Sequence, residues 1–279
     1  MSIPAPPRAF VIGHPIKHSR SPLIHGSWLA SHEIEGSYEA IDVAPEALPG
    51  FMAQLRAGKW RGGNVTIPHK EAVFALCDAV DPLAEKIGAA NTLVRREDGT
   101  IWGTNTDYVG FLNNLDQQAP GWSGTVSRAI VLGAGGASRA ILVALIERGI
   151  GDIRLLNRST DKAEALATSF GGGIVPGPLA DFAALAPEAG LVVNTTAIGM
   201  HGTRFEHLDL GVLPDTALVT DIVYTPLVTP LLADAAARGL RVVDGLGMLL
   251  HQAVPGFEAW FGLRPEVTPE LRARIEATL

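Results

Sequence analysis

The feature that most constrains the fold is a glycine-rich turn between a strand pattern and a helix pattern. Residues 128–132 (RAIVL) predict a buried strand, residues 133–138 follow as GAGGAS, and a helical pattern continues to about Arg148. Glycines at such a turn let the backbone approach a pyrophosphate, and the N–H groups of the helix N-terminus favour an anion. This order predicts a dinucleotide-binding unit; an ordinary tight turn is the alternative. Ser138 stands where glycine or alanine is usual, but it is small enough for close helix–strand packing.

The end of the next predicted strand indicates which dinucleotide binds. An NAD-binding unit usually places Asp or Glu there to bond the ribose 2′-hydroxyl. Here Asn157 occupies the candidate position, Arg158 follows, and Lys162 lies in the next helix start. Arginine can grip a 2′-phosphate through two hydrogen bonds, and lysine adds a point charge. The pattern favours NADP over NAD, unless both cations are simply solvated helix-start charges.

Composition bounds the class of protein. The 279 residues are 47% hydrophobic and 18% charged, which predicts folded cores in one large domain or two of ordinary size. The net charge of −7 argues against non-specific nucleic-acid binding. Residues 1–7 lack the pattern of a signal peptide, no apolar run could span a bilayer, and Cys77 is the only cysteine. We expect a cytoplasmic enzyme, a monomer or homodimer, with no membrane or nucleic-acid partner.

Strand and helix patterns alternate along the chain, which predicts an α/β fold with parallel strands. Strands are expected at 9–12, 38–43 and 63–67, with a hairpin of 92–95 and 100–103 around Asp98-Gly99. Helices are expected from the Ser21-Pro22 pair, over 45–57, from Pro68 and over 107–117. Residues 119–124 (APGWSG) are the best linker candidate. After this linker candidate, strands are expected near 128–132, 153–156, 191–194, 218–221 and 241–243, and then only helices to residue 279, which could pack back on the first domain.

Three polar runs, each after an apolar run and before a helical pattern, predict a pocket for a small polyhydroxylated molecule. They are residues 18–22 (HSRSP), 64–70 (NVTIPHK) and 103–107 (GTNTD). Lys70 and Asp107 together could donate a proton to a carbonyl oxygen as hydride reaches its carbon. Each alone could be a surface lysine or an N-cap; the nearby polar side chains Asn64, Thr66, Asn91 and Thr106 weaken that interpretation.

Two further groups of polar residues bear on ligand and metal binding. Ser19 and Ser21 alternate around Arg20, so an extended segment would point both hydroxyls the same way, toward a carboxylate for example. Either serine could instead satisfy a turn or a cap. The spacing of His14, His18, His25 and His32 does not match a set of metal ligands, so we expect no metal site.

Taken together, these motifs closely resemble the shikimate dehydrogenase family, and they follow the family's order over nearly the whole chain. The matching segments are residues 13–22 (GHPIKHSRSP), 64–70 (NVTIPHK), 88–92 (GAANT), 105–107 (NTD), 133–137 (GAGGA), 157–159 (NRS), 221–226 (DIVYTP) and 244–252 (DGLGMLLHQ). The resemblance implies reversible, NADP(H)-linked reduction of 3-dehydroshikimate to shikimate, a step toward chorismate and aromatic amino acids. It also implies two α/β domains separated by a cleft, with the C-terminal helices on the first. The substrate domain would comprise 1–106 and 246–279, and the Rossmann-like NADP domain 107–245.

The family's functional residues carry over to matching positions here. By resemblance, Lys70 is the catalytic acid/base and Asp107 its partner. The substrate-binding positions are Ser19, Ser21, Asn64, Thr66, Asn91, Tyr224 and Gln252. The cofactor-binding positions are Gly133, Ala134, Gly135, Gly136, Ala137, Asn157, Arg158, Ser159 and Lys162, with Ile222 and Gly245 by the nicotinamide end. The chain departs from many members at Gly26, Lys162, Ile222 and residues 195–197 (TTA), without removing a catalytic group.

Two alternatives stay open. A quinate/shikimate dehydrogenase with relaxed cofactor use would favour an acidic residue at the ribose position, where this chain has Asn157 and Arg158. A non-catalytic shikimate-sensing protein would be expected to lose the lysine or the aspartate and to gain a DNA-binding segment. Both Lys70 and Asp107 are present, and no such segment is apparent.

Overall fold

The chain folds into two compact units, seen in a computed structural model that describes residues 6–171 and 173–279. Unit 1 runs to Thr106 and takes in Gln252–Ala277, whereas unit 2 comprises Asp107–His251 and Thr278–Leu279. Residues 1–5, part of the segment considered as a signal peptide, lie outside the described residues. Within the described part of the chain, no helix has both the length and the apolar character needed to cross a membrane.

Unit 2 is built on a parallel sheet of six strands in the order β13-β12-β10-β7-β8-β9. The strand order reverses between β7 and β10, which is the point where doubly wound sheets bind nucleotides. The strands are β7 (Arg128–Leu132), β8 (Asp152–Asn157), β9 (Ile174–Pro178), β10 (Leu191–Asn194), β12 (Leu218–Asp221) and β13 (Arg241–Val243), and β11 (Ile198–His201) is a short strand outside this sheet. The helices are α5 (Asp107–Gln118), α6 (Gly136–Glu147), α7 (Thr160–Phe170), α8 (Phe182–Leu185) and α9 (Pro230–Ala237), with 3₁₀ turns η2 (Trp122–Gly124), η3 (Leu179–Asp181), η4 (Ala186–Glu188) and η5 (Leu210–Val212).

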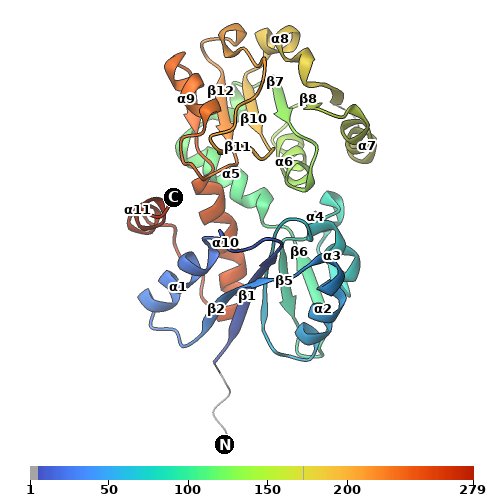
Figure 1. Cartoon of the computed structure of the whole chain (residues 1–279), viewed down its shortest axis with the longest axis vertical. Coiled ribbons are helices and arrows are strands. Elements are labelled where there is room, and N and C mark those ends of the chain that lie inside the picture. Colours follow the sequence, from blue (N-terminus) through green and yellow to red (C-terminus); the bar gives the residue numbers. More distant parts are fainter. Residues whose placement is uncertain (1–5, 172) are drawn as a thin grey trace, which may run out of the picture. The chain divides into compact units, whose positions relative to one another are not determined.

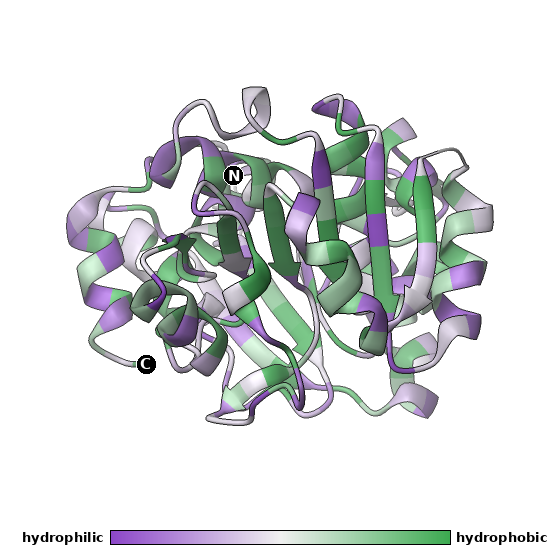
Figure 2. Cartoon of the chain, turned by 90° about the horizontal axis from the view of Figure 1, so that it is seen from above, coloured by the Kyte–Doolittle hydropathy of each residue, from purple (hydrophilic) through white to green (hydrophobic). Residues whose placement is uncertain are grey.

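Both faces of this sheet are buried, which explains its nearly continuous apolar strands. Successive side chains of β7 alternate between two cores: Ala129 and Val131 pack in one, Ile130 and Leu132 in the other. The first core is closed by apolar residues of α5, α6 and α7, and the second by residues that include Phe182 and those of α9. Figure 2 shows the central strands as mainly hydrophobic, with hydrophilic residues gathered on outer helices and loops.

Unit 1 has a mixed sheet of six strands in the order β2-β1-β3-β5-β6-β4. Pairs β1–β2, β1–β3 and β4–β6 are parallel, whereas β3–β5 and β5–β6 are antiparallel. The strands are β1 (Arg8–Gly13), β2 (Ser37–Asp42), β3 (Gly62–Val65), β4 (Ala79–Val80), β5 (Thr92–Arg95) and β6 (Ile101–Thr104). The helices are α1 (Ser21–Ser31), α2 (Leu48–Arg56), α3 (Lys70–Leu76), α4 (Pro82–Ile87) and α11 (Pro269–Glu276), with η1 (Pro45–Ala47), while α10 (Leu246–Phe261) continues from unit 2 into unit 1.

Helices cover both sides of this sheet (Figure 1). The core under α2 and α3 joins Phe10 and Ile12 of β1 to residues of both helices. On the α1 and α10 side, Trp260 Nε1 donates to the Leu93 carbonyl at 2.9 Å, and Trp28 Nε1 donates to the Glu266 carbonyl at 3.1 Å. These bonds confirm that the C-terminal segment packs on the first part of the chain.

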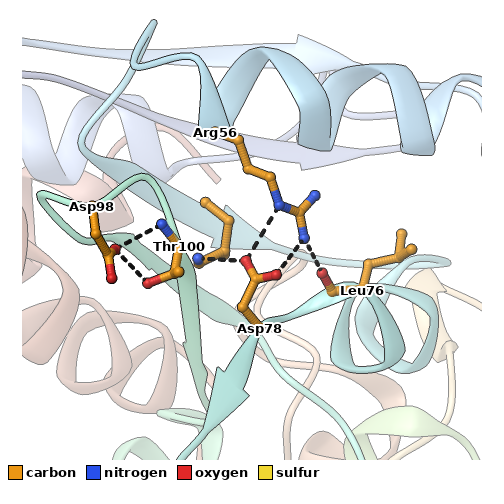
Figure 3. A network of polar contacts seen from close by, with 6 residues as sticks. Arg56, Leu76, Asp78, Asp98 and Thr100 are labelled. Atoms are coloured by element: carbon orange, nitrogen blue, oxygen red, sulfur yellow. Dashed lines mark hydrogen bonds and ion pairs between the residues drawn. The ribbon is translucent and has the colours of Figure 1, made fainter.

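A polar network ties the hairpin to the helical side of unit 1 (Figure 3). Asp78 accepts two hydrogen bonds from the Arg56 guanidinium, both at 3.2 Å, and one from the Ile101 backbone N–H at 2.8 Å. The Ile101 N–H and then Arg56 hold the pKa of Asp78 below its usual range. At the turn of the hairpin, Asp98 accepts from the N–H and the hydroxyl of Thr100. The network fixes the start of β6, the strand that leads into the polar run at residues 103–107.

The structure confirms most of the expected elements and corrects four. Helix α3 begins at Lys70 rather than Pro68, and Arg20 rather than Ser21 is the N-cap of α1. The expected helix over 45–57 is a 3₁₀ turn followed by α2. Residues 119–124 do not link the units, because the boundary falls at Thr106 and Trp122 lies buried in the core of unit 2. Strands β4, β9 and β11 were not expected.

Candidate functional site

A hydrogen-bonded set of amides and hydroxyls lies where β3, β5 and β6 of unit 1 meet. Asn91 Oδ1 accepts from the Thr106 N–H at 2.7 Å and from the Thr92 and Thr106 hydroxyls at 3.0 and 3.1 Å. The Thr106 hydroxyl also lies 3.4 Å from Gln252 Oε1, which α10 supplies. Asn64 Nδ2 donates to Thr92 Oγ1 at 3.2 Å. Asn64, Thr92 and Gln252 come from three different elements, and Asn91 and Thr106 come from the segments beside β5 and β6, yet one connected network holds all five.

Tyr38 and Ser21, which share a side-chain hydrogen bond, extend the set toward the first helix. Tyr38 on β2 donates its hydroxyl to Asn64 Oδ1 at 2.6 Å, and desolvation raises the pKa of Tyr38 well above its usual value. Ser21, the first residue of α1, is buried, and its N–H donates to Ser19 Oγ at 3.3 Å. Ser21, Asn64, Asn91 and Gln252 are each at most 7% exposed. The structure therefore brings together most of the predicted substrate-binding residues of unit 1.

His25 packs against Tyr38 inside a cage of aromatic rings. Its ring stacks on Tyr38 with 4.0 Å between ring centroids, and Trp28, Phe257 and Trp260 surround it. Among the described residues, neither ring nitrogen finds a hydrogen-bond partner. Burial lowers the pKa of His25 to about 3, and the nearby Asn64 side chain opposes this only in part, without reaching hydrogen-bond geometry. His25 is thus a neutral ring that supports Tyr38.

Lys70 is placed by the turn between β3 and α3. Thr66 precedes this turn and is half-buried, and the turn is closed by the His69 N–H donating to the Thr66 carbonyl at 3.0 Å. His69 is buried, with Nε2 2.6 Å from the Val43 carbonyl. The Lys70 carbonyl accepts from the Ala90 N–H at 2.9 Å, which ties the first turn of α3 to the segment that carries Asn91. The lysine backbone is therefore fixed beside the amide set of unit 1.

The glycine-rich turn of unit 2 lies at the reversal of strand order, between β7 and α6. Gly133 has a φ of +105°, and a Cβ there would lie 2.6 Å from Thr196 Cγ2, so only glycine fits. Gly135 is exposed, and a Cβ there would meet nothing within 4 Å. Ser138 is fully buried and donates its hydroxyl to the Gly135 carbonyl at 2.6 Å. The turn combines a tight backbone with open space at a helix N-terminus, which suits a pyrophosphate.

The predicted 2′-phosphate residues follow β8. Asn157 is the last residue of that strand, and its Nδ2 donates to the Ser159 carbonyl at 2.9 Å, which shapes the turn into α7. Arg158, Ser159 and Lys162 are all exposed. The amide of Asn157 therefore serves the turn, and the two cations remain accessible to a phosphate.

The remaining predicted residues of unit 2 lie at the start of α5 and after β12 and β13. Asp107 is the first residue of α5 and is 5% exposed. Ile222 and Tyr224 follow β12 and are half-buried. A Cβ at Gly245 would lie 2.6 Å from the Ile222 carbonyl, so glycine permits a close approach of these two segments. The two positions expected by the nicotinamide end are thus adjacent.

Several residues with buried hydrogen bonds near these positions were not predicted as site residues: Tyr38 and Thr92 in unit 1, and the hydrogen-bonded pair Asn194 and Asp221 in unit 2. Tyr38 and Thr92 lie within strand patterns, where period-2 alternation predicts burial but not the partner. Asp221 carried a stronger signal, since a carboxylate ending a buried apolar strand demands hydrogen-bond donors. Burial of Asp221 raises its pKa.

Among the described residues, no group of three His, Cys, Asp or Glu side chains could hold a metal ion.

Comparison with known proteins identifies the family. Three family profiles match the chain in order: the shikimate dehydrogenase substrate binding domain at residues 11–93, shikimate / quinate 5-dehydrogenase at 117–226, and the shikimate 5'-dehydrogenase C-terminal domain at 245–269. Shikimate dehydrogenase (NADP(+)) of Mesorhizobium japonicum is 60% identical over 277 residues, covering 99% of this chain and 98% of the relative. The chain belongs to the shikimate dehydrogenase family.

Solved structures of the family agree with this fold. Shikimate 5-dehydrogenase of Thermus thermophilus, in complex with NADP(H) and shikimate, is 40% identical with a TM-score of 0.84, covering 98% of this chain and 99% of that one. Quinate dehydrogenase of Corynebacterium glutamicum, in complex with NAD, is 29% identical with a TM-score of 0.87, covering 98% of each chain. The expected α/β fold with a substrate-binding and a Rossmann-like unit is confirmed.

Proposed function

We propose that this chain catalyses the reversible, NADP(H)-linked reduction of 3-dehydroshikimate to shikimate, a step toward chorismate and aromatic amino acids. The observation that carries the proposal is the full-length match, 60% identical, to a shikimate dehydrogenase (NADP(+)). Two features of the structure support it. Unit 1 holds a connected set of amides and hydroxyls next to Lys70, which suits a ligand with several hydroxyls. Unit 2 has a glycine-rich turn at the reversal of strand order.

The residues of unit 2 fit NADP. The open space at Gly135 and the N-terminus of α6 would receive the pyrophosphate, and Arg158 and Lys162 would hold the ribose 2′-phosphate. No carboxylate occupies the Asn157 position, where it would repel a phosphate. When bound, NADPH supplies the hydride that reduces the carbonyl carbon.

The chain's own residues would bind the substrate and move the proton. Ser19 and Ser21 donate hydroxyl hydrogens to the substrate carboxylate, while Asn64, Thr66, Asn91 and Gln252 bind ring hydroxyls, and Tyr224 also contributes to substrate binding. Lys70 gives its proton to the carbonyl oxygen as the carbon is reduced, and takes it back in the reverse direction. Asp107 orients the ammonium group. We also propose that the enzyme works in the cytoplasm, because its single cysteine needs no oxidising compartment.

The proposal is tested by measuring oxidation of shikimate and of quinate, each with NADP and with NAD, at the nicotinamide absorbance. Turnover with shikimate and NADP alone is expected. The fold shared with an NAD-bound quinate dehydrogenase makes comparable turnover with quinate or NAD the main competing result, and it would place the protein with broader enzymes. A folded protein that binds shikimate and turns over no pair would instead be a sensor.

A further inference from the structure

A buried carboxylate at the end of β12 has a complete set of hydrogen-bond donors and no place in the mechanism above. Asp221 is 0% exposed. Its Oδ1 accepts from Asn194 Nδ2 and from the Val223 N–H, both at 2.9 Å, and its Oδ2 accepts from the Thr229 hydroxyl at 2.7 Å. A buried charge is costly unless donors surround it, and here three donors from three segments do so.

The first of these segments leads back to the glycine-rich turn. Asn194 pairs with Asp221 across β10 and β12, and its Oδ1 accepts from the N–H and the hydroxyl of Thr196 at 2.9 and 2.8 Å. The neighbouring Thr195 donates its hydroxyl to the Leu132 carbonyl at 2.8 Å. Residues 195–196 therefore lie directly against Gly133, which leaves no room for a Cβ. Hydrogen bonds and this contact connect Asp221 to the turn that receives the pyrophosphate.

The other two donors come from the part of the chain that follows β12. The Val223 N–H is in the middle of residues 222–224, which carry Ile222 and Tyr224. The Thr229 hydroxyl also accepts from the Leu232 N–H at 3.3 Å, so it caps α9 while it donates to Asp221. Residues 223–229 are thus held at both ends by one carboxylate.

We propose that Asp221 is a positioning residue that fixes residues 222–224 relative to the glycine-rich turn, so that the nicotinamide end of the cofactor and the substrate meet Ile222 and Tyr224 correctly. The inference rests on the proposed function, from which the roles of those two residues come. Asp221 itself touches neither ligand, because its oxygens are occupied by donors of the chain. Loss of one donor should loosen the segment at the nicotinamide end and leave the adenosine end intact.

Thr229 offers the sharpest test. Thr229→Val removes the hydroxyl but keeps the shape, and Thr229→Ser keeps the hydroxyl. With Thr229→Val we expect roughly a tenfold fall in kcat with shikimate and NADP and a similar weakening of NADPH, measured by nicotinamide fluorescence. Binding of adenosine 2′,5′-bisphosphate, which lacks the nicotinamide, should stay within about twofold. Thr229→Ser should give wild-type values of kcat and of both affinities. Asp221→Asn should lower kcat and the affinity for NADPH more than Thr229→Val does, again with little change in the affinity for the bisphosphate.

A matched control separates this effect from the loss of a helix cap. Thr268 caps α11 in the same way, before a proline and with its hydroxyl accepting from the Leu271 N–H at 3.2 Å, and it is not among the hydrogen-bond partners of Asp221. Thr268→Val should leave both ligand affinities and kcat unchanged. Equal weakening of NADPH and the bisphosphate by Thr229→Val, or no effect on either, would overturn the inference. Lack of turnover in the wild type would defeat the proposed function alone, since the two binding measurements still decide the role of Asp221.

Discussion

At the scale of single residues, Lys70 is the side chain on which the proposed chemistry depends. Its backbone is held at the first turn of α3 by the Ala90 N–H, 2.9 Å from its carbonyl, so the side chain starts from a fixed point. Lys70→Ala should lower kcat by roughly 10²–10⁴-fold, with a smaller effect on the KM for shikimate, because proton transfer is lost. Steady-state kinetics check this. Lys59→Ala, at an exposed lysine of the same unit, should behave like the wild type. Near-normal turnover of Lys70→Ala would remove the residue from its role.

A second residue decides between cofactors. Arg158 is exposed just after β8, where its guanidinium can form two hydrogen bonds with a 2′-phosphate. Hydrogen bonds to charged groups contribute roughly 1.5–3 kcal/mol each, so Arg158→Ala should raise the KM for NADPH at least tenfold. The KM for NADH should hardly change, and Lys162→Ala should have the weaker effect of a lost point charge. An equal rise for both cofactors would place Arg158 away from the 2′-phosphate.

At the scale of elements, two glycines of the β7–α6 turn serve different purposes, one for the fold and one for the cofactor. Gly133 has a φ of +105° and no room for a Cβ, so Gly133→Ala should destabilise the free protein by roughly 1–3 kcal/mol or more. Gly135 has open space around its Cβ position, so Gly135→Ala should leave the thermal midpoint nearly unchanged and raise the KM for NADPH several-fold. Two measurements distinguish these roles: thermal unfolding of each ligand-free variant, and titration of each variant with the cofactor. A large drop in the midpoint of Gly135→Ala would show that this glycine serves the fold instead.

The sequence predicted the elements whose patterns are strong. Buried parallel strands such as β7 and β10 are short apolar runs, and Asp98-Gly99 predicted the β5–β6 hairpin. β9 was missed because IVPGP contains two prolines and a glycine, which a sheet tolerates at an edge such as the one β9 forms beside β8. The linker prediction failed because proline and glycine mark turns inside a unit as well as between units. Trp122 explains the difference, since a large apolar residue favours burial in a core over exposure in a linker.

The sequence proposes residues for the candidate site but does not predict the hydrogen bonds that connect them. Lys70 and the glycine-rich turn were predicted from motifs at strand ends, and Asn91 from the family resemblance of residues 88–92. The bonds from Tyr38 to Asn64 and from Asn194 to Asp221 join residues 26 and 27 positions apart. Such pairings depend on strand register, which a single sequence does not specify. Polar residues within apolar strand patterns therefore indicate that partners exist without indicating which.

At the scale of the whole molecule, stability in mild acid should depend on His25. A folded pKa of about 3 against 6.5 means that unfolded chains bind more protons between these values. The contribution of the neutral His25 ring to the free energy of unfolding is therefore fully present above about pH 6.5 and is lost as the pH falls toward 3. Carboxylates such as Asp78, whose pKa is held below 3.8, act at lower pH. The interval from about pH 4.5 to 6.5 is left mainly to His25, with a smaller part from His251, whose pKa burial also lowers, and an opposing part from Asp221, whose pKa burial raises.

Replacing His25 with a side chain that does not titrate isolates its contribution to the pH dependence of stability. Each pH unit below 6.5 should cost up to about 1.4 kcal/mol, so the wild type should lose about 2 kcal/mol between pH 7 and pH 5 through His25 alone. In His25→Gln that loss should be absent, even though the variant is less stable at pH 7. Urea unfolding at both pH values measures the difference. His32→Gln, at the exposed histidine that caps the C-terminus of α1, should keep the wild-type loss. If His25→Gln loses as much stability as the wild type, the buried ring takes up its proton without unfolding, and the aromatic cage must open to water in the native state.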